Sequence, residues 1–297
     1  MAVVLFSERY VPVETWLLSV EITPSNIVVK MKIRTISDQS AESRKPVTAG
    51  VVAVALAISF CATALQAQPI YVPNSSFELQ SAAGYPQGAN PSVDAWQKIA
   101  EPAYFQFVSG GQIPWYGTAG VFVDNNPYGN RVGNQAGYIL SFPQVTLFQD
   151  YSVTPAFDAT YEIGKAYDLT IGIYGKGSSA PIAPGATLTL SLYYRNGMGD
   201  KVTVGSTDVV YSSAIFPGAG ALNFIDYQVS IPRVQPGDAW AGEHIGIQLE
   251  STIPIELTTG GNWDFDNVRL TGVPEPTALA LIGLGFGGLL ATHRRRS

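Results

Sequence analysis

Apolar residues recur at every second position through the middle of the chain. The alternation is clearest over residues 186–193, 223–231 and 244–250, and a period of two is typical of a strand with one buried face. Clusters of Gly, Pro, Asn and Ser separate such runs, and no sustained 3.6-residue period occurs over residues 68–272. The pattern predicts an all-β domain over residues 68–272, an antiparallel β-sandwich of the jelly-roll type.

An apolar run of a different kind precedes this domain. Residues 50–60 are an eleven-residue apolar stretch that follows Lys and Arg residues and is followed by small residues. This order is typical of a signal peptide, which we assign to residues 31–67 with cleavage by signal peptidase after Ala67, cleavage after Ala64 being an alternative. A retained membrane helix is the alternative. Residues 1–30 show no sustained period and precede a second methionine, Met31, so we expect an unstructured segment from a start assigned too early.

A second uncharged run lies at the other end of the chain. Residues 277–292 carry no charge and are followed by His293 and a cluster of arginines. As a helix they would extend about 24 Å, a little less than the ~30 Å hydrocarbon core of a bilayer. The arginine end should stay on the cytoplasmic side. The sequence therefore predicts a short C-terminal transmembrane helix, with the bulk of the chain outside.

Three ordered features within residues 273–297 resemble the PEP-CTERM sorting signal of Gram-negative bacteria. They are a P-E-P motif, the uncharged run and a terminal Arg cluster, carried by Pro274, Glu275, Pro276, Arg294, Arg295 and Arg296. The resemblance implies export across the inner membrane, transient anchoring, and cleavage near P-E-P by the membrane protease exosortase. Release to the cell surface or the exopolysaccharide matrix of a biofilm would follow. A plain C-terminal membrane anchor is the alternative.

Composition narrows the classes of partner. Residues 68–272 hold eight Lys and Arg against seventeen Asp and Glu, a net charge of −9, compared with −6 for the whole chain. So acidic a domain is not expected to bind nucleic acid. The only cysteine, Cys61, lies in the predicted signal peptide. The mature domain therefore has no disulfide and no thiolate chemistry, and packing must stabilise it.

The two ends of the domain carry a second resemblance. V-P-N-S-S-F-E at residues 72–78 and W-D-F-D-N-V-R-L at residues 263–270 are similar to the first and last strands of galactose-binding-like jelly rolls, the fold of many carbohydrate-binding modules. The resemblance implies that the two strands lie near one another. It also implies a structural Ca²⁺ at their junction, with Glu78 and Asp266 as the matching ligands. Calcium prefers oxygen ligands such as these.

Aromatic residues make up 11% of the chain, and several lie in the Gly- and Pro-rich segments of the first half. A sugar ring stacks on exposed aromatic rings while acidic and amide side chains bond its hydroxyls. Trp115 is our first candidate, because Pro114 and Gly117 predict a surface turn around it; packing of the same ring against the sandwich is the alternative. The candidate polysaccharide-binding residues are Trp115, Tyr116, Tyr128, Asp124 and Asn126.

Motifs for catalysis are few. The mature domain has one histidine, His244, in a strand-like run, and neither G-x-S-x-G nor H-E-x-x-H occurs. We therefore predict a protein that is not an enzyme, a surface or matrix protein that binds carbohydrate. The alternatives are a structural or adhesive matrix protein without a glycan ligand, a glycoside hydrolase, and an ice-binding protein. The ice-binding alternative depends on a short polar face formed by Thr187, Thr189 and Ser191.

Overall fold

The computed structural model describes residues 16–23, 26–33, 67–79, 81–84, 89–105, 114–123, 128–176, 182–216, 223–257 and 261–274. The chain divides into two units, residues 1–52 and residues 53–297. In the first unit, β1 (Trp16–Thr23) pairs with β2 (Asn26–Ile33) as an antiparallel hairpin. In its register Leu18 is the partner of Met31, and Val20 is the partner of Val29.

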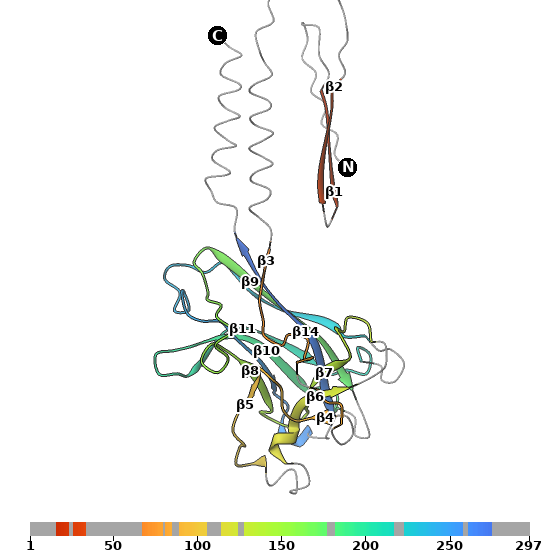
Figure 1. Ribbon diagram of the computed structural model, residues 1–297, viewed down its shortest axis with the longest axis vertical. Helices are drawn as coiled ribbons and strands as arrows, with labels where there is room; N and C mark the ends of the chain where they lie inside the picture. Colours follow the sequence, from red (N-terminus) through yellow and green to blue (C-terminus); the bar gives the residue numbers. More distant parts are fainter. Residues whose placement is uncertain are drawn as a thin grey trace, which may run out of the picture. The chain divides into compact units, whose positions relative to one another are not determined.

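The second unit is built from two antiparallel sheets (Figure 1). The five-stranded sheet has the order β11-β10-β13-β8-β5. Its strands are β11 (Lys201–Val210), β10 (Thr187–Arg195), β13 (Gly246–Ser251), β8 (Thr146–Gln149) and β5 (Gln97–Lys98). Strands next to one another in a sheet are mostly far apart in sequence, so each sheet contains strands from distant parts of the domain sequence.

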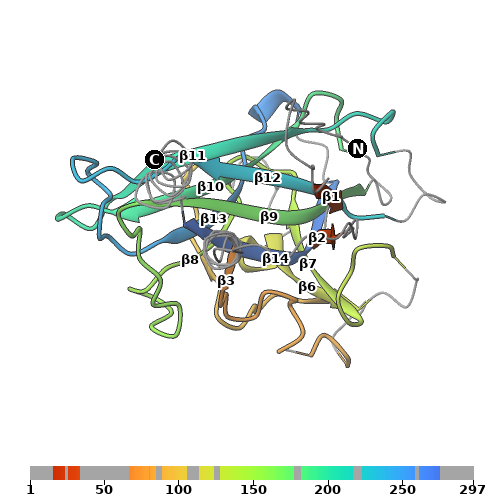
Figure 2. The ribbon, with the colours of Figure 1, turned by 90° about the horizontal axis from the view of Figure 1, so that it is seen from above.

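The seven-stranded sheet has the order β12-β9-β14-β7-β6-β4, and β3 pairs with β14 beside this path. Figure 2 shows β12, β9 and β14 running side by side when the molecule is seen from above. The strands are β12 (Ile225–Ile231), β9 (Lys165–Lys176), β14 (Asn262–Pro274), β7 (Gln135–Leu140), β6 (Ala119–Val123), β4 (Ala89–Asn90) and β3 (Gln68–Ile70).

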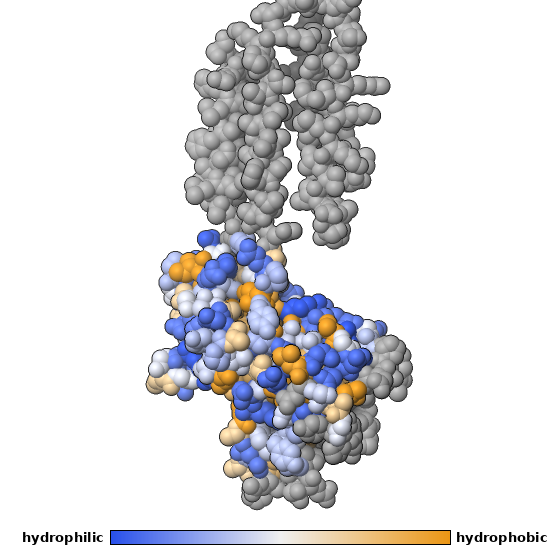
Figure 3. All heavy atoms as spheres, viewed as in Figure 1, coloured by the Kyte–Doolittle hydropathy of each residue, from blue (hydrophilic) through white to orange (hydrophobic). Residues whose placement is uncertain are grey.

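The core lies between the two sheets and follows the alternation in the sequence. Leu188, Leu190 and Leu192 of β10 are fully buried, and the intervening Thr187 and Thr189 are partly exposed. Trp263 of β14 is 0% exposed, and its ring meets Tyr211 and Phe216 edge-on. On the described face, hydrophilic and hydrophobic residues are interspersed (Figure 3). The prediction of an all-β antiparallel sandwich is confirmed.

Short helical turns are the only helices among the described residues, and they are η2 (Trp115–Thr118) and η3 (Ile255–Leu257). None is long and apolar enough to cross a membrane. The apolar part of the predicted signal peptide and the predicted C-terminal helix lie outside the described residues.

The first and last strands of the domain lie side by side (Figure 1). Gln68, Pro69 and Ile70 pair with Gly272, Thr271 and Leu270. The motif V-P-N-S-S-F-E joins this arrangement, because Val268 N–H donates to the carbonyl of Ser75 at 2.9 Å. The two segments that resemble the terminal strands of galactose-binding-like domains therefore meet, as the resemblance implied.

Candidate functional site

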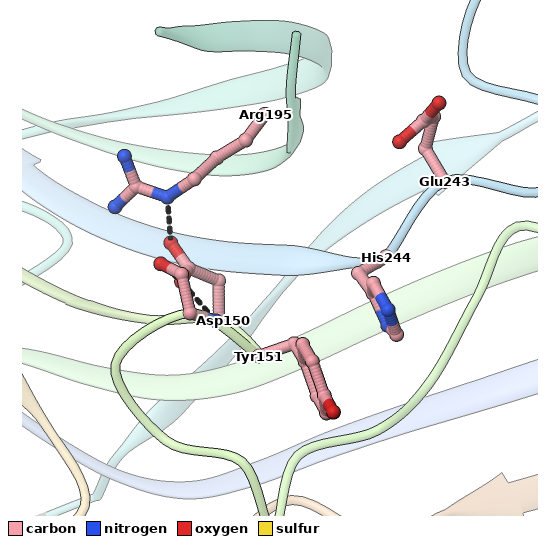
Figure 4. A pocket seen from close by; sticks show the side chains of 6 residues that line it. Asp150, Tyr151, Arg195, Glu243 and His244 are labelled. Carbon is pink, nitrogen blue, oxygen red and sulfur yellow. Dashed lines mark hydrogen bonds and ion pairs between the residues drawn. The ribbon is translucent and has the colours of Figure 1, made fainter. Parts of the chain in front are cut away.

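Three neighbouring strands of the five-stranded sheet meet at a hollow of about 90 Å³. Asp150, Tyr151 and Ser152 follow the end of β8, and Arg195 is the last residue of β10. Glu243 and His244 stand just before β13, which lies between β8 and β10. Because adjacent strands are antiparallel, these ends and beginnings fall at the same end of the sheet. Figure 4 shows the six side chains around the hollow.

One side of the hollow is an ion pair whose carboxylate, Asp150, is buried. Asp150 is 3% exposed, and its Oδ2 accepts hydrogen bonds from Arg195 Nε at 2.8 Å and from the Tyr193 hydroxyl at 2.6 Å. Ser152 donates its backbone N–H to Oδ1 at 3.0 Å. Burial opposes ionisation of Asp150, but these hydrogen bonds and the Arg195 charge outweigh it, so the pKa of Asp150 is lowered. Arg195 is thereby held in a fixed position.

The opposite side is an aromatic platform, by which we mean the rings of Tyr151 and His244. The two rings are stacked, with centroids 4.2 Å apart and planes inclined by only 5° (Figure 4). His244 Nδ1 lies 3.3 Å from Asp158 Oδ1, and Ile245 N–H donates to the carbonyl of Ala159 at 2.7 Å. Tyr151 is 42% exposed. The platform is therefore accessible from solvent and held from behind by the segment that leads into β9.

The predicted carbohydrate-binding residues do not come together at this hollow. Pro114 precedes the short helix η2, as a surface turn requires, and Tyr116 is 64% exposed. Trp115, however, is only 9% exposed, because its Nε1 donates to the Ile99 carbonyl and its ring packs on Phe105. The structure thus corrects the prediction that Trp115 presents a stacking surface; the packing alternative holds.

Tyr128 is also packed rather than presented to solvent. It is 8% exposed, and its ring meets Tyr174 and Phe224 at 6.0 and 5.5 Å. Burial in this aromatic cluster corrects its assignment as a ligand-binding residue. Asp124 and Asn126 lie outside the described residues.

The threonine hydroxyls of the polar face considered for ice binding form hydrogen bonds with neighbouring side chains. The Thr187 and Thr189 hydroxyls lie 2.7 and 2.8 Å from the hydroxyl of Thr252, and Thr189 also donates to Asp208. Ser191 is buried. The Thr187 and Thr189 hydroxyls are therefore engaged in hydrogen bonds with neighbouring side chains.

The two predicted calcium ligands hold the same loop. Glu78 Oε1 accepts the backbone N–H groups of Asn134 at 2.9 Å and Gln135 at 2.5 Å. Asp266 Oδ2 accepts the N–H of Val132 at 2.6 Å. The loop passes so close to Glu78 that a Cβ on Gly133 would lie 2.4 Å from the Glu78 carboxyl carbon, and Gly133 has φ of +79°. The structure therefore brings the two carboxylates to one junction.

One carboxylate oxygen of Asp266 is not used to hold the loop. Asp266 is 0% exposed, and its Oδ1 has no hydrogen-bond partner among the described residues. Burial, and to a smaller extent the charge of Glu78, raise the pKa of Asp266 to about 7. In the described part of the chain no three His, Cys, Asp or Glu side chains gather. A bound Ca²⁺ would therefore need backbone carbonyls or water besides these two carboxylates.

A row of polar side chains crosses the seven-stranded sheet at its middle strands. Asp264 of β14 lies opposite Tyr138 of β7 and Tyr174 of β9, and directly opposite residues share a face. Asp264 is 1% exposed and accepts a hydrogen bond from Asn262. Burial raises the pKa of Tyr138 to about 12, and burial with the Asp264 charge raises the pKa of Tyr174. The Tyr138 hydroxyl donates to the Gly117 carbonyl at 3.2 Å. Asp264 is therefore a buried carboxyl flanked in register by two tyrosines.

The family model described as HpiC1 cyclase matches residues 68–271. The chain belongs to the HpiC1-like family. The match covers the described β-sandwich from β3 almost to the end of β14. The family takes its name from a cyclase, an enzyme class that no motif in the sequence indicated. No curated protein matches the chain.

Solved structures similar to this HpiC1-like chain include a cyclase and carbohydrate-binding modules. A cyclase from Fischerella sp. TAU is 19% identical over 70% of this chain and 98% of its own, with a TM-score of 0.48. The module TmCBM61 in complex with β-1,4-galactotriose is 13% identical over 68% and 98%, with a TM-score of 0.37. A xylan-binding domain from CBM 22 is 13% identical over 69% and 99%, with a TM-score of 0.31.

A second family model, the PEP-CTERM protein-sorting motif, matches residues 272–296. The resemblance found in the P-E-P motif, the uncharged run and the Arg cluster is therefore confirmed. The motif marks an exported protein that is sorted to the cell surface by exosortase. Of the sorting residues, Pro274 ends β14, and Glu275, Pro276, Arg294, Arg295 and Arg296 lie outside the described residues.

Proposed function

We propose that this surface-sorted HpiC1-like protein binds carbohydrate, and that the aromatic platform of Tyr151 and His244 is the contact surface. The observation that carries the proposal is the parallel stack of the two rings, with Tyr151 42% exposed, beside side chains of both charges. Export to the cell surface supplies the setting in which glycans are met. The first and last strand motifs, which resemble those of carbohydrate-binding modules, support the same class of ligand.

The chemistry of the hollow suits one sugar unit at its edge. A sugar ring presents C–H groups on one face, which pack on an aromatic ring, while its hydroxyls point sideways. Arg195 offers donors, Glu243 offers acceptors and Ser152 offers both, and all line the hollow. Liquid water takes about 30 Å³ per molecule, so roughly 90 Å³ admits a substituent such as a hydroxymethyl or carboxyl group. The rest of the ring would lie on the platform.

Tyr151→Ala should weaken retention in polysaccharide affinity gels and leave the melting temperature nearly unchanged. An aromatic contact is worth about 0.5–1.5 kcal/mol beyond area burial, so affinity should fall several-fold, up to about tenfold. Tyr71→Ala is the matched control, because Tyr71 is 70% exposed and does not line the hollow. Equal retention of both variants would exclude the platform. A wild type that no polysaccharide retards would favour the alternative of a structural or adhesive matrix protein.

Ring closure of a small molecule is a second candidate function, favoured by the family match and the row Tyr138–Asp264–Tyr174. A cyclisation without loss of atoms gives a product of the same mass, and a buried carboxyl is suited to deliver or take the proton that such a step requires. Asp264 and its neighbours supply that group on a rigid sheet. This candidate differs from the sequence-based prediction of a protein that is not an enzyme.

Asp264→Asn tests this candidate. Asparagine keeps the shape of the side chain and removes its exchangeable acid proton. In cells of the native host carrying D264N, an isobaric pair of metabolites should shift from the cyclised to the open isomer, by at least about a hundredfold for a lost general acid. Asp226→Asn is the control, since Asp226 is a half-exposed carboxylate paired with Arg269. Identical metabolite profiles in wild type and D264N would remove the enzymatic candidate.

A further inference from the structure

We propose that the folded sandwich controls the sorting cleavage, because strand pairing keeps the chain just before the P-E-P motif unavailable to the protease until that strand end opens. The proposal depends on the sorting motif and is independent of carbohydrate binding or cyclisation. It names a role for β3, the short first strand, which we call the clamp strand (Gln68–Ile70). The clamp strand pairs with the last residues of β14 before the motif.

The end of β14 is held on both edges. On one edge Gly272, Val273 and Pro274 are the register partners of Tyr167, Ala166 and Lys165 in β9. On the other edge Gly272 and Thr271 face Gln68 and Pro69 of the clamp strand. Gly272 therefore lies between two strands and is buried, only two residues before Pro274. No spacer separates the sheet from the first residue of P-E-P.

The partner strand is itself fixed at this end. Val234 N–H donates to the Lys165 carbonyl at 2.9 Å, and Gly164 N–H donates to the Val234 carbonyl at 3.0 Å. Lys165 Nζ forms an ion pair with Glu162 at 2.7 Å. The start of β9 is thus tied to the segment after β12 rather than left as a free end. Opening the last residues of β14 therefore requires breaking their hydrogen bonds to β9 while β9 itself stays in place.

A protease needs these residues in an unpaired, extended conformation. An extended peptide bound by another protein offers it the backbone N–H and C=O groups that a sheet otherwise uses. Residues 271 and 272 pair with both β9 and the clamp strand, and residues 273 and 274 pair with β9. The backbone groups used in this pairing are not available to a protease. Cleavage close to the motif then depends on local opening of the strand end, and proteolysis of an opened state follows the population of that state.

The clamp strand connects the two ends of the precursor. It begins at Gln68, the residue that follows the predicted signal-peptide cleavage after Ala67. One short strand, adjacent to the N-terminal processing point, therefore covers the edge of the C-terminal processing point. A stronger clamp should delay release of the surface form, and a weaker clamp should hasten it. All surface forms should end after Pro274, because residues before it lie within the sheet.

A disulfide across the clamp tests the proposal. Gln68 and Gly272 are directly opposite, and paired antiparallel Cα atoms lie about 4.5–5.5 Å apart, within disulfide range. A Cβ at Gly272 meets its nearest heavy atom at 3.5 Å, so the substitution fits. The full chain carrying Gln68→Cys, Gly272→Cys and Cys61→Ser is expressed in the native host. Pulse labelling should show the cleaved fraction at a fixed time falling at least about fivefold, with recovery after reduction.

A matched crosslink and a loosening variant complete the experiment. Thr189→Cys with Asp208→Cys joins register partners on β10 and β11, in the other sheet, and should leave cleavage at the wild-type rate. Ile70→Ala should speed cleavage, since Ile70 is the clamp residue that packs against the core. Cleavage of the oxidised clamp variant at the wild-type rate would overturn the proposal. So would an intact mass of the wild-type surface form that ends before Pro274, or an unchanged rate for Ile70→Ala in a domain of lowered melting temperature.

Discussion

Trp115→Ala should lower the free energy of unfolding by about 3 to 5 kcal/mol, the usual cost of truncating a buried aromatic ring. Trp115 is 9% exposed, and its ring meets Phe105 edge-on with centroids 4.8 Å apart. Phe105 in turn meets Phe142 at 5.5 Å, so the loss of one ring loosens a cluster of three. The substitution also leaves the Ile99 carbonyl without the Nε1–H donor that reaches it at 2.9 Å.

The neighbouring residue supplies a stringent control. Tyr116 is 64% exposed on the same short helix, so Tyr116→Ala should change the free energy of unfolding by less than about 0.5 kcal/mol. Urea unfolding of both variants measures the difference directly. If Trp115→Ala instead unfolds at the wild-type urea concentration and loses retention on polysaccharide gels, Trp115 would be a ligand-stacking residue after all.

This pair of residues shows what the sequence could and could not predict. Pro114 and Gly117 correctly indicated a turn, and the structure has the helix η2 there. Both Trp115 and Tyr116 carry the same local signals, yet one is buried and the other exposed. Which side of a turn faces inward depends on the segment that packs beneath it, here Phe105 and Ile99. That information comes from tertiary structure and not from local sequence.

The strands were predictable because their signal is local. Alternation over residues 186–193 and 244–250 corresponds to β10 and β13. The meeting of Glu78 with Asp266 followed from motifs at the two ends of the domain. The order of strands within a sheet has no such local signal, because the pairing of β14 with β9 joins residues that are about 86 to 109 positions apart, from Asn262↔Lys176 to Pro274↔Lys165.

The hollow was missed for this reason. Tyr151 and His244 are far apart in the sequence, and neither belongs to a recognisable motif. Their rings meet only because β8 and β13 are neighbours in the sheet. His244 was noted as the sole histidine of the mature domain, inside a strand-like run. The structure places it just before the strand, where its ring can stack on Tyr151. Predicting the hollow would have required the order of strands in the sheet rather than a further sequence motif.

Calcium should stabilise the domain through Glu78 and Asp266, raising the melting temperature by about 5–10 °C at a hundredfold excess over Kd. A ligand held only by the folded state adds about 2.7 kcal/mol at that excess, and 1 kcal/mol moves the melting temperature of a domain of this size by roughly 2–4 °C. The physical reason is the buried Oδ1 of Asp266, which has no hydrogen-bond partner among the described residues. A cation would supply the missing interaction.

The pH dependence gives this prediction a second readout. With chelator present, burial raises the folded-state pKa of Asp266 from its ordinary value to about 7. The folded state then holds a proton that the unfolded state has released, so the stability contributed by Asp266 is complete below about pH 4 and is lost as the pH rises through 7. Calcium replaces the proton, and its stabilisation should therefore grow between pH 5 and pH 8.

Asp266→Asn should abolish both the calcium shift and its growth with pH, because the amide carries no charge for the ion and no titrating proton. Asn keeps an oxygen that can accept the Val132 N–H, so the loop contact need not be lost. Asp168→Asn is the control, since Asp168 accepts a hydrogen bond from Ser230 at the surface and should leave the calcium shift intact. Scanning calorimetry at pH 5 and pH 8, with calcium or with chelator, separates the cases. Identical melting temperatures with calcium and with chelator at pH 8 would mean that the junction is held by its backbone hydrogen bonds alone.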